Sequence, residues 1–89
     1  MVDPDTRQFK ISKKADKFIK SLPDDIRKEV KEAVSNLITG GFQNLDIKRL
    51  PPYPHEYRLR VGKIRLLFKS ERGLLFIFKA GFRGDVYKK

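Results

Sequence analysis

The strongest structural signal in this chain is Tyr57-Arg58-Leu59-Arg60-Val61-Gly62-Lys63-Ile64-Arg65-Leu66-Leu67-Phe68. Apolar and basic residues alternate before Gly62, and the apolar side chains resume after Lys63. Side chains along a β-strand point alternately to the two faces of the sheet. Gly62 followed by Lys63 suits a two-residue type II′ turn, in which glycine comes first. The stretch therefore predicts a tight β-hairpin with one apolar face and one cationic face.

The position of this turn fixes the residues that pair across the hairpin. On the apolar face the predicted pairs are Val61 with Ile64, Leu59 with Leu66, and Tyr57 with Phe68. On the other face Arg60 is expected opposite Arg65, and Arg58 opposite Leu67. Like charges that face each other directly destabilise a sheet. Three arginines on one small exposed face therefore indicate that an anionic ligand binds there.

The overall charge points in the same direction. The chain has 89 residues, which is enough for one small domain with a two-layer core. It carries 21 Lys and Arg against 11 Asp and Glu, a formal net charge of +10. Such a balance favours a polyanionic partner, with nucleic acid ranked first, an acidic protein second and an anionic membrane third. The alternative is a basic surface that serves only solubility, but here the arginines are clustered.

Several classes of protein are excluded by composition. The chain has no cysteine and a single histidine, His55, so we expect no disulfide framework, no thiol nucleophile and no zinc site. No apolar run approaches the roughly 20 residues of a membrane span, and no signal segment opens the chain. We therefore expect a cytoplasmic protein without metal or cofactor. Residues 1–7 are expected to be a short lead, disordered or left by cloning, and residues 8–89 a single domain.

The remaining patterns predict the order of the elements. Phe9-Lys10-Ile11 alternates as a short strand. Apolar residues at helical spacing predict one helix from about Lys13 to Leu22, capped by Ser12, and a longer one that ends at Gly40-Gly41. Residues 42–55 are expected to be a connection before the hairpin. The apolar run 74–78 predicts a central strand buried on both faces, with Phe76, Ile77 and Phe78 in the core. The order β-α-α-β-β-β is of the α+β class.

This order and three motifs together resemble one known family. The motifs are Lys48-Arg49-Leu50, the hairpin stretch itself, and the closing Arg83-Gly84-Asp85-Val86-Tyr87. From Phe9 to Tyr87 the chain resembles the RelE/ParE superfamily of toxins from type II toxin–antitoxin modules, and the RelE-like branch is favoured. The resemblance implies a curved antiparallel sheet with a helical hairpin on one face and a concave basic cleft on the other.

The resemblance also implies an activity. RelE-like toxins are mRNA interferases, ribosome-dependent endoribonucleases that cut messenger RNA without a metal. The ribonucleotide 2′-OH attacks the adjacent phosphate and leaves a 2′,3′-cyclic phosphate and a free 5′-OH. Translation stops and growth arrests. The implied partners are the ribosome, mRNA and a cognate antitoxin with an acidic segment that wraps the basic face. The alternatives are a ParE-like inhibitor of DNA gyrase without nuclease activity, and a degenerate non-toxic relative.

The family's site residues map onto the motifs quoted above. The resemblance implies these catalytic residues: Arg58, Arg60, Arg65, Arg83 and Tyr87. Lys48, Arg49 and Lys63 are expected to bind RNA. Arg65 and Arg83 would clamp the scissile phosphate, and Tyr87 would stack on a base or exchange a proton. One of Arg58 and Arg60 could instead form a salt bridge with Glu56 or Asp85.

The identity of the general base is left open by the sequence. Arg58 and Arg60 stand where RelE-like toxins commonly carry lysines. An arginine stays protonated, with a pKa above about 12, so neither can accept the proton of the 2′-OH. The remaining candidates are Tyr87 and the pair His55 and Glu56, which precede the hairpin. A slower route without a strong base is the other alternative.

Overall fold

The structure is a computed structural model that describes residues 8–82. Arg83 and Tyr87 lie outside these residues, and the division of the chain at residue 8 stays a prediction. The elements are β1 (Gln8–Ile11), α1 (Lys13–Lys20), α2 (Asp24–Thr39), the 3-10 helix η1 (Phe42–Asn44), β2 (Asp46–Arg49), β3 (Glu56–Val61), β4 (Ile64–Glu71) and β5 (Leu74–Phe82). Neither α-helix in this part of the chain is long and apolar enough to cross a bilayer.

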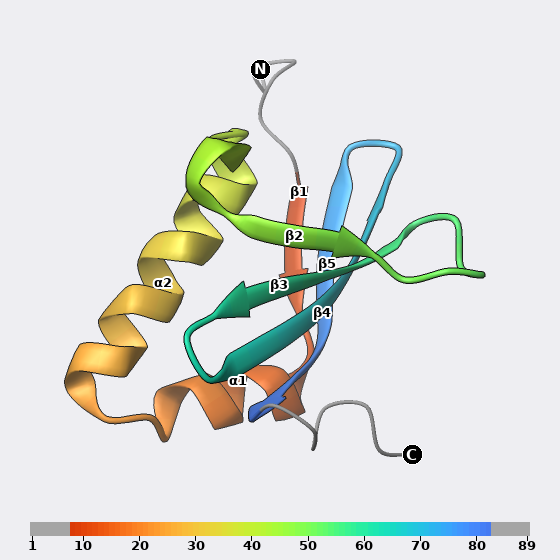
Figure 1. The fold of residues 1–89 in the computed structure, drawn as a ribbon. Coiled ribbons are helices and arrows are strands. Elements are labelled where there is room, and N and C mark those ends of the chain that lie inside the picture. The colour runs from red at the N-terminus through yellow and green to blue at the C-terminus, as the bar shows by residue number, and fades with distance from the viewer. Residues whose placement is uncertain (1–7, 83–89) are drawn as a thin grey trace.

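The strands form one twisted sheet in the order β1-β5-β4-β3-β2, and α1 and α2 pack against one of its faces (Figure 1). The predicted α+β class, with a helical hairpin on one face of the sheet, is confirmed. The sheet is mixed rather than purely antiparallel, because β1 pairs in parallel with β5. After β1 the chain passes through both helices and re-enters the sheet at the opposite edge as β2. Strands β3, β4 and β5 then follow one another back toward β1, so the first and last strands are neighbours.

The prediction that residues 42–55 only connect was wrong, because this segment contains β2. It runs antiparallel to β3, with Asp46 opposite Arg60 and Ile47 opposite Leu59. Ile47 packs against the core while Asp46 and its neighbour Lys48 are exposed. The alternation extends over four residues only, and its partner strand lies ten residues further on, so local pattern alone did not reveal it.

The hairpin has the predicted register. Val61 pairs with Ile64, Leu59 with Leu66, and Arg60 with Arg65. Gly62 has a φ of 58° while Lys63 keeps a negative φ, which is the combination that a type II′ turn requires. This turn matches the twist of the two strands, so it holds the alternation of apolar and basic faces in place.

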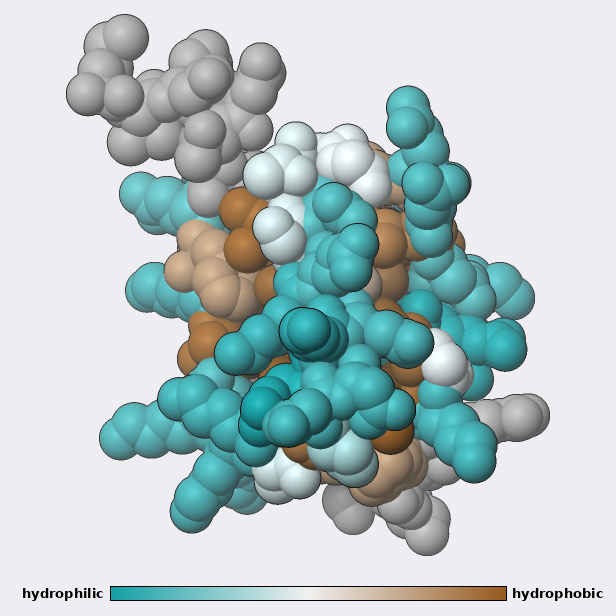
Figure 2. All heavy atoms as spheres, turned by 90° about the vertical axis from the view of Figure 1, so that its left-hand side faces the viewer, coloured by the Kyte–Doolittle hydropathy of each residue, from teal (hydrophilic) through white to brown (hydrophobic). Residues whose placement is uncertain are grey.

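The core lies between the helices and the apolar face of the sheet. Its largest fully buried side chains are Val30, Leu37, Leu59, Ile64, Leu66, Leu75 and Ile77. The α1 helix is tied to β5 by Ser12, whose Oγ accepts a bond from the Ala15 N–H (3.1 Å) and donates to the Phe78 carbonyl (3.2 Å). The α2 helix ends as predicted at Gly40, which has a φ of 87°. The outer side of α2 is mostly hydrophilic (Figure 2).

The central-strand prediction for residues 74–78 was right about position and wrong in part about burial. β5 lies between β1 and β4, and Leu75 and Ile77 are fully buried. Phe76 and Phe78 are only half-buried, with ring centroids 6.3 Å apart. Neither ring belongs to the core between the helices and the sheet. Phe76 pairs with Lys69 and points to the face of the sheet that the helices do not cover.

Candidate functional site

The sheet face opposite the helices collects basic side chains from β2 to β5. Strand register aligns the residues of this face in three rows across the sheet. The first row is Asp46, Arg60, Arg65 and Gly81, the second is Lys48, Arg58, Leu67 and Lys79, and the third is Glu56, Lys69 and Phe76. Neighbouring strands lie about 4.8 Å apart, so these side chains adjoin one another. We call this set the cationic face. Basic residues outnumber acidic ones on it, so it carries a positive potential suited to phosphate.

Asp46 is an acidic residue of the edge strand β2 that pairs with two of these arginines, and sequence reasoning missed it. Its Oδ1 lies 2.8 Å from Arg58 Nη2, and its Oδ2 lies 3.7 Å from Arg60 Nε. From the sequence, Glu56 or Asp85 is the expected partner of one of these arginines. The observed partner is Asp46, and Asp85 lies outside the described residues. Only the β2–β3 register places Asp46 there, so the signal that could have found it was the alternation of β2.

Arg58 and Arg60 differ in how far they reach into solvent. The Arg58 side chain is 14% exposed, and that of Arg60 is 52% exposed. Arg58 Nε is also buried without a hydrogen-bond acceptor in the described part of the chain. A buried donor without an acceptor costs about 1–3 kcal/mol. Arg60 is therefore the arginine that an arriving anion meets first, while Arg58 lies deeper and is held by Asp46.

Arg65 lies on the predicted face, but its expected exposure was wrong. It is 5% exposed, and its Nη1 donates to the carbonyls of Gly62 (3.0 Å) and Ile64 (3.3 Å). β4 is the middle strand of the sheet, so Arg65 has neighbouring strands on both sides. Parity assigns a side chain to a face but does not give its depth. Arg65 thus braces the hairpin turn and contributes its charge from below the surface.

The three residues expected to bind RNA are not brought together. Lys48 pairs with Arg58 and belongs to the cationic face. Arg49 pairs with Tyr57, which packs against the core, so Arg49 has the opposite parity. Lys63 is exposed in the hairpin turn, at one end of the face. Only Lys48 extends the row that contains Arg58.

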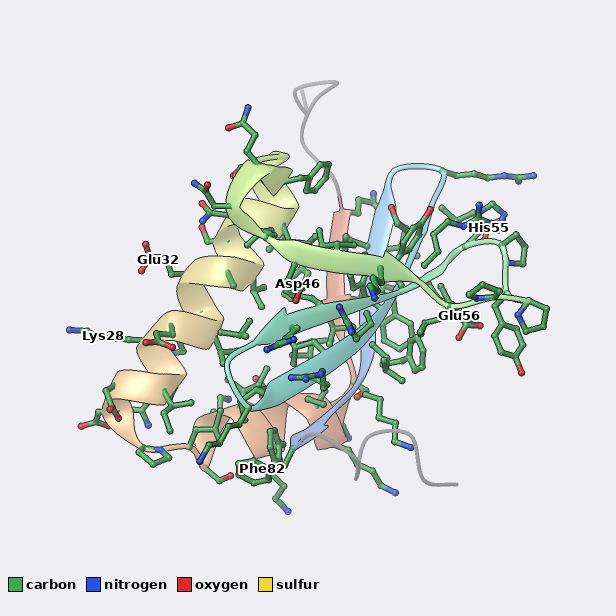
Figure 3. All side chains as sticks on the ribbon, viewed as in Figure 1. Lys28, Glu32, Asp46, His55, Glu56 and Phe82 are labelled. Carbon is green, nitrogen blue, oxygen red and sulfur yellow. The ribbon has the colours of Figure 1, made fainter. Side chains whose placement is uncertain are left out.

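His55 lies at the far end of the hairpin from the turn. Its Nε2 is 3.7 Å from Glu71 Oε1, and its carbonyl accepts a bond from the Ser70 N–H. Glu56 has the parity of the cationic face but stands in the row of Lys69. Figure 3 shows both residues well away from Asp46, which lies between β2 and β3. The structure therefore does not bring His55 into the arginine cluster.

On the helix side, an apolar groove of about 370 Å³ opens next to β2. Its lining comes from α2, the η1 segment and strands β2 to β4: Leu37, Phe42, Leu45, Ile47, Tyr57, Phe68 and Ser70. β2 is an edge strand of the sheet, so the groove and the cationic face lie on the two sides of an edge to which another strand can pair.

No family model and no curated protein matches the sequence. Several solved structures match the fold. A chain of the RelB-RelE antitoxin-toxin complex from Methanococcus jannaschii is 25% identical, with a TM-score of 0.74 over 88% of this chain and 94% of that one. A chain of the archaeal RelE-RelB complex from Pyrococcus horikoshii OT3 is 24% identical, with a TM-score of 0.77 over 90% and 98%.

More distant structures share the same fold. The isolated E. coli RelE toxin is 19% identical, with a TM-score of 0.66 over 92% of each chain. A chain of the E. coli DinJ-YafQ toxin-antitoxin complex is 15% identical, with a TM-score of 0.74 over 93% of this chain and 99% of that one. The resemblance predicted from the sequence is thereby confirmed at the level of the fold.

Proposed function

We propose that this chain, which has the RelE-like fold, is the toxin of a type II toxin–antitoxin pair and cuts mRNA on the ribosome. In the proposed reaction a 2′-OH attacks the adjacent phosphate and leaves a 2′,3′-cyclic phosphate and a 5′-OH. The toxin assignment rests on similarity to chains that occur in RelB-RelE and DinJ-YafQ complexes. Its place would be the cytoplasm, where it would meet translating ribosomes and arrest growth.

The observation that carries the nuclease proposal is the cationic face. Arg60 is half-exposed in the row nearest the hairpin turn, with Lys48 and Arg58 in the adjoining row. Guanidinium groups bind phosphate through paired N–H donors and hold the charge that builds on it in the transition state. Arg65 adds its charge from a buried position, where water screens it less. Arg83 and Tyr87, outside the described residues, would complete the site as the resemblance implies.

One observation favours a second candidate, a ParE-like inhibitor of DNA gyrase that cuts nothing. Arg58 is paired with Asp46, and Arg65 is bonded to the backbone of the turn. Arginines held in this way suit a rigid docking surface as well as a phosphate clamp. A third candidate is a degenerate, non-toxic relative that only binds its antitoxin or nucleic acid.

The proposed antitoxin would carry an acidic segment over the cationic face. A chain with a net charge of +10 should meet such a segment rapidly through electrostatic steering. The apolar groove beside β2 would receive apolar side chains of the same partner. Because β2 is an edge strand, the partner could add a strand there.

The experiment that separates the candidates compares two targets. Purified protein is added to a reconstituted translation reaction, to the same mRNA without ribosomes, and to a gyrase supercoiling reaction. New mRNA 5′ ends that appear only with ribosomes would support the nuclease. Inhibition of supercoiling without new 5′ ends would replace it with the gyrase inhibitor. If a folded protein produces neither new mRNA 5′ ends nor inhibition of supercoiling, the non-toxic relative is the remaining candidate.

A further inference from the structure

We infer that Asp46 is the general base that takes the proton from the attacking 2′-OH. The inference rests on the proposed nuclease function and assigns a residue that the sequence analysis did not consider. Asp46 is the carboxylate within ion-pair distance of both Arg58 and Arg60. A carboxylate has oxygen lone pairs that can accept a proton, whereas a guanidinium group is a donor only, so the cluster contains its own proton acceptor.

The two oxygens of this carboxylate have different surroundings. Oδ1 accepts a 2.8 Å hydrogen bond from Arg58 Nη2. Oδ2 lies 3.7 Å from Arg60 Nε, beyond hydrogen-bond distance. The Asp46 side chain is 47% exposed. One oxygen therefore fixes the orientation of the group while the other can accept a proton from a substrate in solvent-accessible space.

The position of Asp46 also suits the geometry of the reaction. Asp46 stands directly opposite Arg60, the exposed arginine that would hold the scissile phosphate. The 2′-oxygen is adjacent to that phosphate in the chain, so it comes within reach of the same side of the face. His55 precedes Arg60 by five residues, or about 16 Å of extended strand, and Glu56 by about 13 Å. Asp46 therefore starts closer to Arg60 than either of them does, because it is its cross-strand partner.

The proposed step balances without any further reactant except water. The 2′-OH gives its proton to Oδ2 of Asp46 as the bond from O2′ to phosphorus forms. The bond from phosphorus to O5′ breaks, and O5′ takes a proton from water. Asp46 then returns its proton to solvent. Arg58 stays paired with Oδ1 throughout, which makes it a positioning residue as well as a counter-charge.

The test compares Asp46→Asn with Asp16→Asn on ribosomes programmed with one mRNA. Asp16 is a matched control: it pairs with Lys20 on α1, away from the cationic face, and its side chain is 42% exposed. Both changes remove one negative charge and keep the shape. We expect the single-turnover cleavage rate of Asp46→Asn to fall by about 10²-fold or more. Its affinity for the ribosome complex should be unchanged or tighter, and Asp16→Asn should cut normally.

A second measurement separates a base from a residue that only positions Arg58. Asp46→Ala is assayed with propionate or chloroacetate added at equal ionic strength. The two ions are similar in size, but propionate is the stronger base. Propionate should restore cleavage to a greater extent than chloroacetate, whereas a positioning role gives equal rescue. If Asp46→Asn does not fold, Asp46→Glu, which keeps a carboxylate, and Asp46→Gln, which replaces it with an amide of the same shape, form a second pair.

Each remaining outcome is decisive. Normal cleavage by folded Asp46→Asn overturns the inference and leaves the nuclease proposal standing. No cleavage by the unchanged protein overturns the nuclease proposal and this inference with it. If Asp46→Asn loses both ribosome binding and cleavage, Asp46 shapes the cationic face and is not the base. The same conclusion follows if propionate and chloroacetate restore cleavage by Asp46→Ala equally.

Discussion

Asp46 Oδ1 lies 2.8 Å from Arg58 Nη2, across the antiparallel pair of β2 and β3. An edge strand thus supplies a carboxylate to a surface on which basic residues outnumber acidic ones. Because the Arg58 side chain is mostly buried, this contact affects both stability and the charge that a ligand meets.

Asp46→Ala should lower the free energy of unfolding by about 1–2 kcal/mol, a value between those of exposed and buried ion pairs. The change leaves the guanidinium of Arg58 mostly buried without its carboxylate. Chemical denaturation measures the loss. Asp16→Ala, which breaks the exposed pair with Lys20, should cost less than about 0.5 kcal/mol. Equal losses in the two variants would mean that burial of Arg58 does not strengthen its pair.

Arg65→Ala should destabilise the protein by about 1–3 kcal/mol, since it removes a buried side chain and two bonds to the backbone. This reverses the simple expectation for an arginine on an exposed sheet face. The shift in the midpoint of urea denaturation measures this loss of stability. A variant as stable as the unchanged protein would show that Arg65 does not brace the turn at Gly62.

Leu59→Asp should unfold the domain, because it places a charge at a site with 0% exposure. Arg60→Asp, one residue on, introduces the same side chain on the opposite face and should remain folded. Circular dichroism and dispersion of amide NMR signals distinguish the two states. A well-folded Leu59→Asp would contradict the strand parity on which the cationic face depends.

RNA affinity should fall steeply with salt, because each phosphate neutralised by a basic residue releases bound counterions. Arg60→Gln should reduce the slope of log affinity against log salt by about 1. Lys28→Gln removes an equal charge from the exposed side of α2 and should leave the slope unchanged. Identical slopes for both variants would mean that RNA does not meet Arg60.

The hairpin was predictable because its information is local. The turn at Gly62 sets the register, and alternation then assigns every side chain of β3 and β4 to a face. β2 was not predictable in this way, because four alternating residues are a weak signal and their partner strand follows a loop. Asp46 was missed with it, since its meeting with Arg58 exists only through that pairing.

Depth was the second quantity that the pattern could not supply. Arg65 and Phe76 were assigned from their sequence neighbours, one as exposed and the other as core. Arg65 is in fact buried, because it lies on the middle strand of the sheet. Phe76 is only half-buried, because it faces the side of the sheet without helices. Burial depends on what covers a face, and strand periodicity carries no information about that cover.

The role of the cationic face in mRNA cleavage is tested by mapping mRNA 5′ ends in a reconstituted translation reaction. The reaction is run with Arg60→Gln, with Lys28→Gln and with the unchanged protein. We predict ribosome-dependent cuts, each leaving a 2′,3′-cyclic phosphate, from the unchanged protein and from Lys28→Gln, and strongly reduced cutting by folded Arg60→Gln. Cuts of equal yield from all three proteins would contradict the claim that the cationic face carries the reaction. Absence of cuts from all three would contradict the nuclease itself.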